Sequence, residues 1–519
     1  MIESGSVAPS QQQAHSVVNV TKRLYERLDG ALDELAAAKG FAKSTYQTNI
    51  FQIAEVLMGS AEGMRALYER AHRFDEIGVF EGGPWVNPAK LQPPLVAGGL
   101  KAGGVYPVVE TLSELRMLAI AQGRARSEVS AEEATAFLNA VMALNLEFIF
   151  PGDTEEERMQ TIPHRESILR LFALLVEELD LSSLRGDVVS EIEQICAQRP
   201  IMTGRVRNMI EMAARIPQEG AATDVERRLQ IFTRAIRGPS QLCQRYPGLA
   251  EYRQGLKSCD AVTLEKEAGE FAESMTATGL TCPHHAILLR HLRAREPGLI
   301  PVALALNERG IAEFTQNRDF ALQLVRVAIL PVTSQSIYGF ARLLEYGLLS
   351  RQEVKAGLTR IVELDLQSEV RGNLLARRQT CDGITANALL LAGVIAVFGQ
   401  PLGVGQGRNP TCQAARAISL WGQHAQGYLL GLLISAARDG FVALPFEGEM
   451  IRSDELTGGL ATQPDLKLDP VSIVLVPHLD RIYDAMMKRV ALRQEDGHKW
   501  VNPALYGSWV PKGFASVFA

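Results

Sequence analysis

The segments SAEEATAFLNAVMALNLEF (Ser130–Phe148) and RESILRLFALLVEELD (Arg165–Asp180) carry apolar residues three and four positions apart. This spacing places the apolar side chains on one face of an α-helix, so both segments are predicted to be amphipathic helices. Similar blocks, separated by turn residues, fill the chain from Thr111 to about Leu375. No fixed repeat period relates the blocks. The pattern therefore predicts an irregular all-α assembly and not a solenoid.

Helical patterns also precede this region. Val20–Gly40 and Ser44–Phe74 are amphipathic, and Gly40 and Gly59 stand where a helix would break or pack closely. Residues 1–15 are polar and are expected to form a flexible tail.

A stretch rich in glycine and proline interrupts the helical pattern at residues 81–107, EGGPWVNPAKLQPPLVAGGLKAGGVYP. Such composition opposes a helix and favours turns or short strands, so we expect a structured arm or long loop. With this arm included, residues 16–376 form one large helical region.

The sequence pattern of residues 377–519 differs from that of the helical region and predicts a smaller α+β domain. A glycine-rich connection leads into an apolar helix, and the β-branched run VSIVLV (Val471–Val476) is the clearest strand candidate. A second helix is expected over residues 479–494. The last part, HKWVNPALYGSWVP (residues 498–511), suits strands and turns.

Composition excludes several classes of protein. The 519 residues are 47% hydrophobic and 22% charged, which excludes wholesale disorder and, at about 150 residues per domain, predicts two to four domains. A net charge of -6 argues against nucleic acid or an anionic membrane as partner. The start MIESGSVAPSQQQ resembles no signal peptide, and the apolar run Ala388–Phe398 is too short to span a bilayer. A cytoplasmic protein is expected.

The six cysteines form no CxxC pair, so we expect reduced thiols and neither a disulfide scaffold nor a zinc ribbon. Cys412 follows a glycine-rich loop and Pro410-Thr411, at the expected start of an apolar helix. Helix N-terminal N–H groups stabilise a thiolate and can bind an oxyanion, and the Gln406 amide could add a second donor. A buried structural cysteine is the alternative.

A nucleophilic cysteine needs a base and a group that orients the base. His478 follows the predicted strand, where its side chain could face a cleft, and Asn502 could hold the imidazole. His498 ranks lower as a base, since few residues after it could supply an orienting group. For Asn502 the alternative role is a simple Asn-Pro turn.

A helix-start cysteine, a histidine after a strand and a tryptophan motif with an acid or amide resemble the transglutaminase-like branch of the papain-like fold. In that family the third motif reads like Gly-Trp-Asp-Pro, and GHKWVNPALYG is similar with Asn502 at the aspartate position. Asparagine is what papain-like proteases use there. The resemblance covers only about the last 140 residues.

This resemblance implies acyl-enzyme chemistry by a Cys412, His478 and Asn502 triad, with Gln406 at the oxyanion. We expect an acyltransferase that takes an acyl group from a thioester or carboxamide and passes it to an amine, with no cofactor and no metal. The natural-product branch, as in antibiotic biosynthesis, adds an acyl carrier protein as a partner. A hydrolase with the same triad and a non-catalytic helical scaffold are the alternatives.

Three other features compete with this interpretation. Cys381 also precedes a helix-like run, but the adjacent Asp382 opposes thiolate formation. The loop GQPLGVGQG lacks the ending of a phosphate loop. The segment TCPHHAILLRH predicts a helix start with exposed histidines more than a metal site, since adjacent histidines point to different faces. Its candidate ligands are Cys282, His284, His285 and His291.

The pentapeptide WVNPA occurs twice, at Trp85–Ala89 and at Trp500–Ala504. A shared turn type explains the repeat most simply. The functional interpretation is that Trp85 reaches the catalytic domain and offers an apolar contact to the substrate.

Overall fold

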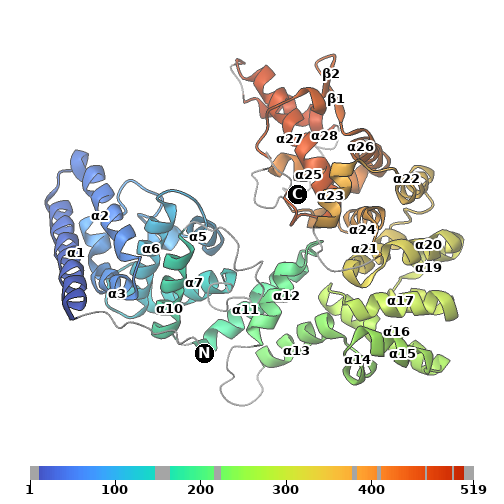
Figure 1. The fold of residues 1–519 in the computed structure, drawn as a ribbon, viewed down its shortest axis with the longest axis horizontal. Helices are drawn as coiled ribbons and strands as arrows, with labels where there is room; N and C mark the ends of the chain where they lie inside the picture. The colour runs from blue at the N-terminus through green and yellow to red at the C-terminus, as the bar shows by residue number, and fades with distance from the viewer. Residues whose placement is uncertain are drawn as a thin grey trace, which may run out of the picture. The chain divides into compact units, whose positions relative to one another are not determined.

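The structure is a computed structural model that describes residues 11–145, 164–179, 181–214, 224–376, 383–405, 411–461, 465–493 and 496–507. It is mostly helical, as expected (Figure 1). Two compact units form, one from residues 1–191 and 211–225 and the other from residues 192–210 and 226–519. The expected domain limit at residue 377 coincides with no limit of these units. The chain passes between the units within α11 (Leu181–Ala197), α12 (Gly204–Ala213) and α13 (Asp224–Arg237).

The first unit contains the predicted amphipathic helices, and they break near Gly40 and Gly59 as expected. Residues 81–107, expected to be non-helical, include a short helix (α5) and a 3₁₀ turn, Pro88–Lys90. The reason is that each begins at proline, which the first turn of a helix tolerates. The helices are α1 (Gln11–Ala37), α2 (Lys43–Leu57), α3 (Ala61–Arg70), α4 (Phe74–Ile77), α5 (Pro93–Leu100), α6 (Tyr106–Ala121), α7 (Ala131–Leu144) and α10 (Arg165–Glu178).

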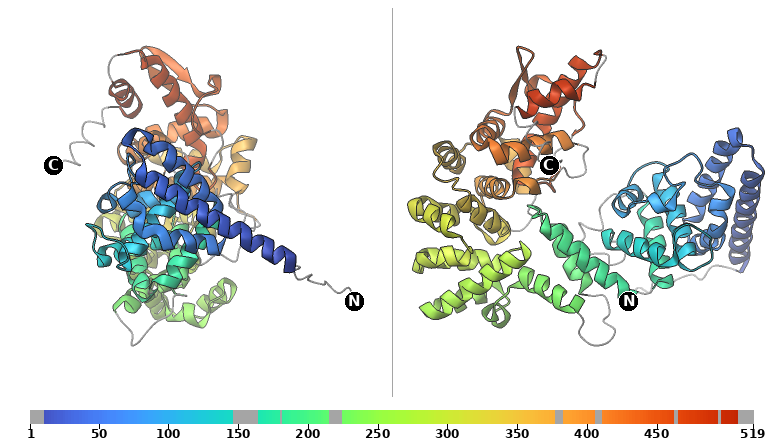
Figure 2. Two further views of the ribbon diagram at one scale, coloured as in Figure 1. Left: turned by 90° about the vertical axis from the view of Figure 1, so that its left-hand side faces the viewer. Right: turned by 180° about the vertical axis from the view of Figure 1, so that it is seen from behind.

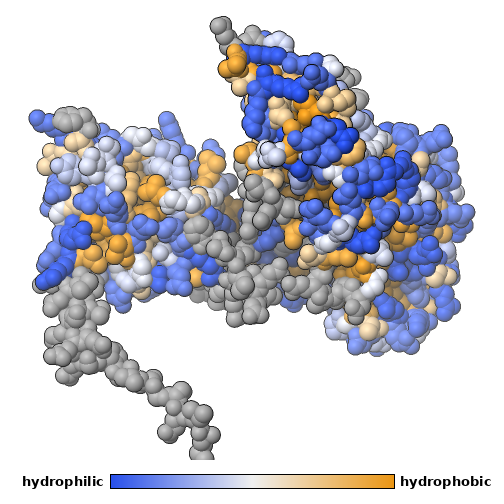
Figure 3. Space-filling model, turned by 45° about the horizontal axis from the view of Figure 1, so that its top comes forward, coloured by the Kyte–Doolittle hydropathy of each residue, from blue (hydrophilic) through white to orange (hydrophobic). Residues whose placement is uncertain are grey.

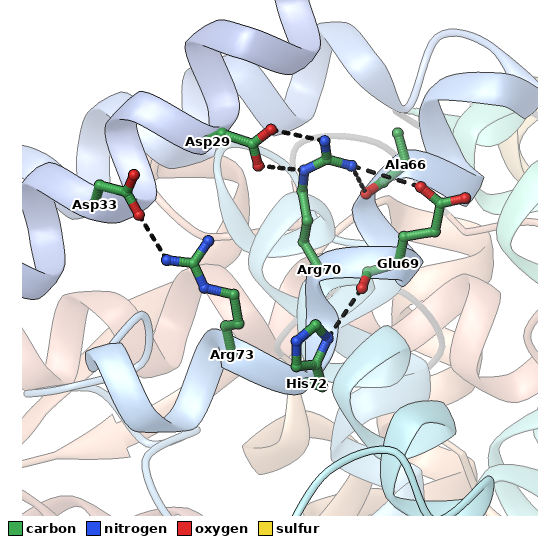
Figure 4. A network of polar contacts seen from close by, with 7 residues as sticks. All are labelled: Asp29, Asp33, Ala66, Glu69, Arg70, His72 and Arg73. Atoms are coloured by element: carbon green, nitrogen blue, oxygen red, sulfur yellow. Dashed lines mark hydrogen bonds and ion pairs between the residues drawn. The ribbon is translucent and has the colours of Figure 1, made fainter.

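Ion pairs fix the rotation of α1 against the end of α3 (Figure 4). Arg70 donates from Nε and Nη2 to the two carboxylate oxygens of Asp29, at 2.6 and 2.8 Å. Arg73 donates to Asp33, one turn further along α1, at 2.6 Å. An adjacent face of α1 buries leucines in the core. Because partly exposed ion pairs contribute only about 0.2–1 kcal/mol each, the leucines hold α1 and the pairs set its register.

Helix α6 carries charged side chains into the interior of the first unit. Arg116 is fully buried and donates from Nη1 to Asp75 at 2.8 Å and to the Trp85 carbonyl at 2.9 Å. Glu114 is also fully buried, and neither of its carboxylate oxygens has a partner among the described residues. Burial, followed by the nearby charge of Glu110, raises the pKa of Glu114 well above its ordinary value. The fold therefore favours the protonated form of the Glu114 carboxyl.

We expect the Glu114→Gln variant to stabilise the first unit, and to do so more at pH 8 than at pH 5. In the unfolded chain the Glu114 carboxyl ionises as the pH rises above about 4.5. Its pKa is higher in the folded protein, so rising pH costs stability that glutamine does not lose. Thermal unfolding at both pH values measures this. The exposed Glu132→Gln in the same unit is the control. An equal effect of the two variants at both pH values would contradict the buried, protonated state.

The second unit has one two-stranded sheet among its described residues. β1 (Ala443–Phe446) pairs antiparallel with β2 (Glu449–Arg452), with Phe446 opposite Glu449. The two turn residues, Glu447 and Gly448, both have positive φ, as a type I′ hairpin requires. The helices are α14 (Gln241–Arg245), α15 (Leu249–Lys257), α16 (Ala261–Thr278), α17 (Pro283–Arg295), α18 (Ile300–Ala303), α19 (Glu308–Gln316), α20 (Arg318–Ala328), α21 (Ser336–Glu345), α22 (Gln352–Val362), α23 (Ser368–Ala376), α24 (Ala386–Gly399), α25 (Cys412–His424), α26 (Gln426–Asp439), α27 (Pro470–Val490) and α28 (His498–Tyr506).

Helix α24 is the centre of the second unit. It is apolar on all sides and buried almost completely, so it packs against helices all round, chiefly α21, α22 and α27. At its crossing with α21 the backbones touch, because a Cβ on Gly339 would lie 2.7 Å from the Ala396 Cα and one on Gly399 would lie 2.1 Å from the Gly339 carbonyl oxygen. No helix in the described part of the chain is both long and apolar enough to cross a membrane.

Two segments predicted as strands are helical, which corrects the expected α+β domain. VSIVLV forms the first turns of α27, and HKWVNPALY forms α28. Asp469 starts α27, because its Oδ1 accepts from the N–H groups of Val471 and Ser472 at 3.0 Å each. The continuous apolar run reflects a buried helix, a pattern that a buried strand shares. Helices α25, α27 and α28 pack together beside the hairpin (Figures 1 and 2).

Gly339→Ala should destabilise the second unit by about 1–3 kcal/mol or more, because its methyl group would meet backbone atoms that cannot rotate away. Gly431→Ala is the matched control. That glycine lies inside α26 with open space around its Cα, so alanine should be neutral or stabilising by about 0.5–1 kcal/mol. Chemical denaturation measures both. Similar stability of the two variants would show that the contact between α21 and α24 is looser than described.

Candidate active site at Cys412

Cys412 is the first residue of α25 and is exposed. The prediction that a helix begins there is confirmed. The other face of α25 is anchored in the core by Trp421, which is only 2% exposed. The first turn contains no acidic residue, so its unpaired N–H groups and the positive end of the helix dipole face the Cys412 thiol unopposed by a carboxylate of that turn.

His478 does not follow a strand, because it lies within α27, next to Pro477. Its Nδ1 lies 2.9 Å from the Ser453 Oγ. Burial, assisted by Arg481, lowers the pKa of His478 to about 4, which makes its imidazole a weak base. Among the described residues no hydrogen bond joins His478 to Cys412.

Tyr483 is the α27 side chain whose pKa the charge of Cys412 influences. Burial raises the pKa of Tyr483 to about 12, and the negative charges of Cys412 and Asp496 raise it further. Five positions separate Tyr483 from His478 on α27, a rotation of about 140° that places them on different faces. The Tyr483 hydroxyl is buried and has no partner among the described residues. At neutral pH it is a phenol with a proton to donate.

Helix α28 supplies the other side of the site. His498, Asn502 and Tyr506 stand four residues apart and so share one face of the helix. The Tyr506 hydroxyl contacts the Gln413 side chain and lies 3.3 Å from the Gln413 carbonyl oxygen. Burial raises the pKa of Tyr506, and the Cys412 thiol contributes to this rise. The Asn502 Oδ1 is buried without a partner among the described residues.

His498 carries the orienting group that the sequence analysis did not find. Its Nδ1 lies 2.8 Å from the Asp496 Oδ1, which also accepts the His498 backbone N–H at 3.0 Å. These hydrogen bonds lower the pKa of Asp496. The His498 and Tyr483 rings are 6.2 Å apart. The acid precedes the histidine by two residues, so a search on both sides of His498 would have found it.

Cys412, Tyr483, Asp496, His498 and Tyr506 therefore belong to α25, α27, α28 and the residues just before α28, and these three helices pack against one another. Asn502 shares the α28 face that carries His498 and Tyr506, whereas His478 belongs to a different face of α27. Tyr483 and Tyr506 were missed because their positions depend on how these helices pack.

Some predicted residues cannot be placed at this site. Gln406 and Cys381 lie outside the described residues. Trp85 belongs to the first unit, where it lines a pocket of its own. Its contact with a substrate of Cys412 stays a prediction.

The histidine-rich segment at α17 is buried, contrary to the expectation of exposed histidines. The His284 Nε2 lies 3.1 Å from the Pro247 carbonyl oxygen, and the His285 Nε2 lies 2.9 Å from that of Ala303. Burial lowers the pKa of both imidazoles, so both stay neutral and hold chain segments together. In the part of the chain that the structure describes, no three His, Cys, Asp or Glu side chains are grouped to hold a metal.

The second unit also has a cavity of about 530 Å³ beside α24. Its wall is largely apolar and includes Ala392, Gly393 and Pro470, with Arg207 and Gln335 as polar groups. None of the residues around Cys412 lines it.

Comparisons with known proteins give no relative for this chain. No family model matches it, and neither a curated protein nor a solved structure is detectably similar.

Iodoacetamide at neutral pH should alkylate Cys412 before the other described cysteines. Burial raises the thiol pKa of Cys196 and Cys243 to about 12 and of Cys282 to about 11, and it also raises that of Cys259. Time-resolved peptide mapping gives the order of labelling, and the urea-unfolded chain is the control in which the order should disappear. Labelling of Cys259 as fast as Cys412 would contradict this account.

Proposed function

We propose that the protein is a cysteine-dependent acyltransferase that forms an amide bond through a Cys412 thioester. The proposal is carried by two observations: Cys412 is exposed at a helix start, and Tyr483, whose pKa the charge of Cys412 raises, has a buried hydroxyl without a partner among the described residues. Acyl transfer needs both parts, since the thiolate attacks the carbonyl carbon while a fixed donor stabilises the oxyanion that forms.

His498 replaces His478 as the proposed base, and Asp496 takes the orienting role first given to Asn502. The imidazole of His498 removes the Cys412 proton, the sulfur bonds to the acyl carbon, and the leaving thiol or ammonia takes that proton. An amine then attacks the thioester, gives its proton to His498 and releases the amide, and the Cys412 thiol is restored. The Tyr483 hydroxyl supplies the oxyanion donor first assigned to Gln406.

The choice of substrates comes from the transglutaminase-like resemblance and not from the helices around the site. A thioester or carboxamide donor, an amine acceptor and, for the natural-product branch, an acyl carrier protein are therefore proposed partners. The chemistry needs no cofactor. Water in place of the amine would make the protein a cysteine hydrolase.

The test incubates the purified chain with short acyl thioesters and follows intact mass. We expect an acyl adduct that Cys412→Ala abolishes and that forms about 100-fold more slowly in Tyr483→Phe, since one oxyanion donor is lost. His498→Asn should slow it by a similar factor, whereas His478→Asn should stay within a few-fold of the natural chain. A larger loss in His478→Asn would restore the original assignment of the base.

The fate of the adduct separates the candidate functions. Amines added in a series should shift the product from free acid to amide. Free acid alone across a broad panel of amines would indicate a hydrolase. If no thioester or carboxamide donor gives an adduct, the helical scaffold without catalysis replaces the proposal.

A further inference from the structure

Apolar side chains reach the surface of the described chain in several places (Figure 3). One such place, in the first unit, is hollow. A cavity of about 350 Å³ is lined by the aromatic residues Phe51, Phe80, Trp85 and Tyr106. The Trp85 and Tyr106 rings lie 6.1 Å apart at 47°, and Tyr106 is 53% exposed. Phe80 is buried, whereas Phe51 and Trp85 are half-buried, so Tyr106 is the most exposed ring of the wall.

The loop that carries Phe80 and Trp85 is held in place. The Gln47 Nε2 donates to the carbonyl oxygens of Gly78 and Glu81, at 2.9 Å each. The Arg116 Nη1 also donates a hydrogen bond to the Trp85 carbonyl oxygen, at 2.9 Å. A pocket fixed in this way loses little conformational entropy when a ligand binds.

Burial raises the pKa of Glu110 to about 7, and interaction with the Trp85 side chain lowers it, so the two side chains influence each other. Trp85 offers the face of its ring to a ligand. Glu110 is 5% exposed, and its Oε2 has no partner among the described residues. A carboxylate at the indole edge makes the ring face more negative, and a negative ring face attracts cations.

The charges around the cavity favour the same ligand. Arg116, whose guanidinium covers the Phe80 ring at 4.2 Å, pairs with Asp75, and Lys43 pairs with Glu81. Neither Arg116 nor Lys43 lines the cavity, and each is paired with a carboxylate, whereas one carboxylate oxygen of Glu110 has no partner among the described residues.

The polar groups of the wall also limit the kind of cation. The Gln47 amide N–H groups hold the loop, and the Glu81 carboxylate is engaged by Lys43. A primary ammonium or a guanidinium would bring N–H donors that need such acceptors, whereas a quaternary ammonium has none to satisfy.

We propose that this pocket binds a quaternary ammonium group against the faces of Trp85 and Tyr106. The site is independent of Cys412, which belongs to the other unit, so it stands whether or not the acyl transfer does.

The test measures binding to the full chain by titration calorimetry at pH 8, where the Glu110 carboxyl, with a pKa of about 7, is ionised. The probes are choline and 3,3-dimethylbutan-1-ol, its neutral isostere. We expect choline to bind in the millimolar range and the isostere to bind at least about tenfold more weakly. Methylguanidinium should also bind more weakly than choline. Equal binding of choline and the isostere, or tighter binding of methylguanidinium, would overturn the proposal.

Variants locate the site. Trp85→Leu should weaken choline binding by about tenfold or more, and the exposed Tyr106→Leu, which threatens the fold less, should do the same. Glu110→Gln should weaken the binding of choline but not that of the isostere. Trp500→Leu changes the tryptophan of the second WVNPA copy and is the matched control, expected to bind normally. No saturable binding of choline, or equal losses in Trp85→Leu and Trp500→Leu, would contradict the site.

Discussion

The second unit depends on the burial of α24, a helix without a polar face. Such a helix is stable only when neighbours cover every side, and α20 to α23, α25 and α27 supply these neighbours. Glycine makes the contacts close. Gly339 and Gly399 let two backbones touch, and a Cβ on Gly393 would lie 2.7 Å from the Pro470 ring at the start of α27. Dispersion and apolar burial then act over short distances along the whole helix.

The geometry around Cys412 follows from this arrangement. Gly422 of α25 faces Val397 of α24, with only 3.1 Å for a Cβ, and Pro470 starts α27 against the same helix. Since α25 and α27 are both held on α24, their facing ends are fixed, and α28 packs across both. The helices that carry Cys412, Tyr483, His498 and Tyr506 are therefore packed together, although only His498 and Tyr506 are near each other in sequence.

The helical character could be predicted from sequence, because apolar residues spaced three and four positions apart lie on one face of an α-helix. Helix breaks at Gly40 and Gly59 and the helix start at Cys412 were also predictable, since glycine and proline act locally. VSIVLV could not be assigned, because a fully buried helix and a fully buried strand both show an unbroken apolar run. Asn502-Pro503 suggested a turn, yet packing of α28 on α25 and α27 keeps it helical.

The site was also predictable only where local sequence determines the structure. Cys412 is marked by its own neighbours in sequence, whereas the choice between His478 and His498 depends on which face of α27 and α28 turns toward α25. Burial of His478 depends on tertiary packing, whereas the pairing of His498 with Asp496 is local and spans two residues. Trp85 and Trp500 share a pentapeptide, but one lies in a loop beside an aromatic pocket and the other in a helix. Their environments therefore differ although their sequences agree.

The most direct test of the central claim, that Cys412 faces Tyr483 and His498, is NMR on protein with ¹³C-labelled histidine and tyrosine rings, before and after stoichiometric alkylation of Cys412. Ring resonances respond to a change of charge and hydrogen bonding within a few ångströms. The account predicts that the Tyr483, Tyr506 and His498 resonances shift while that of His478 stays in place. A shift of His478 with His498 unmoved would contradict it.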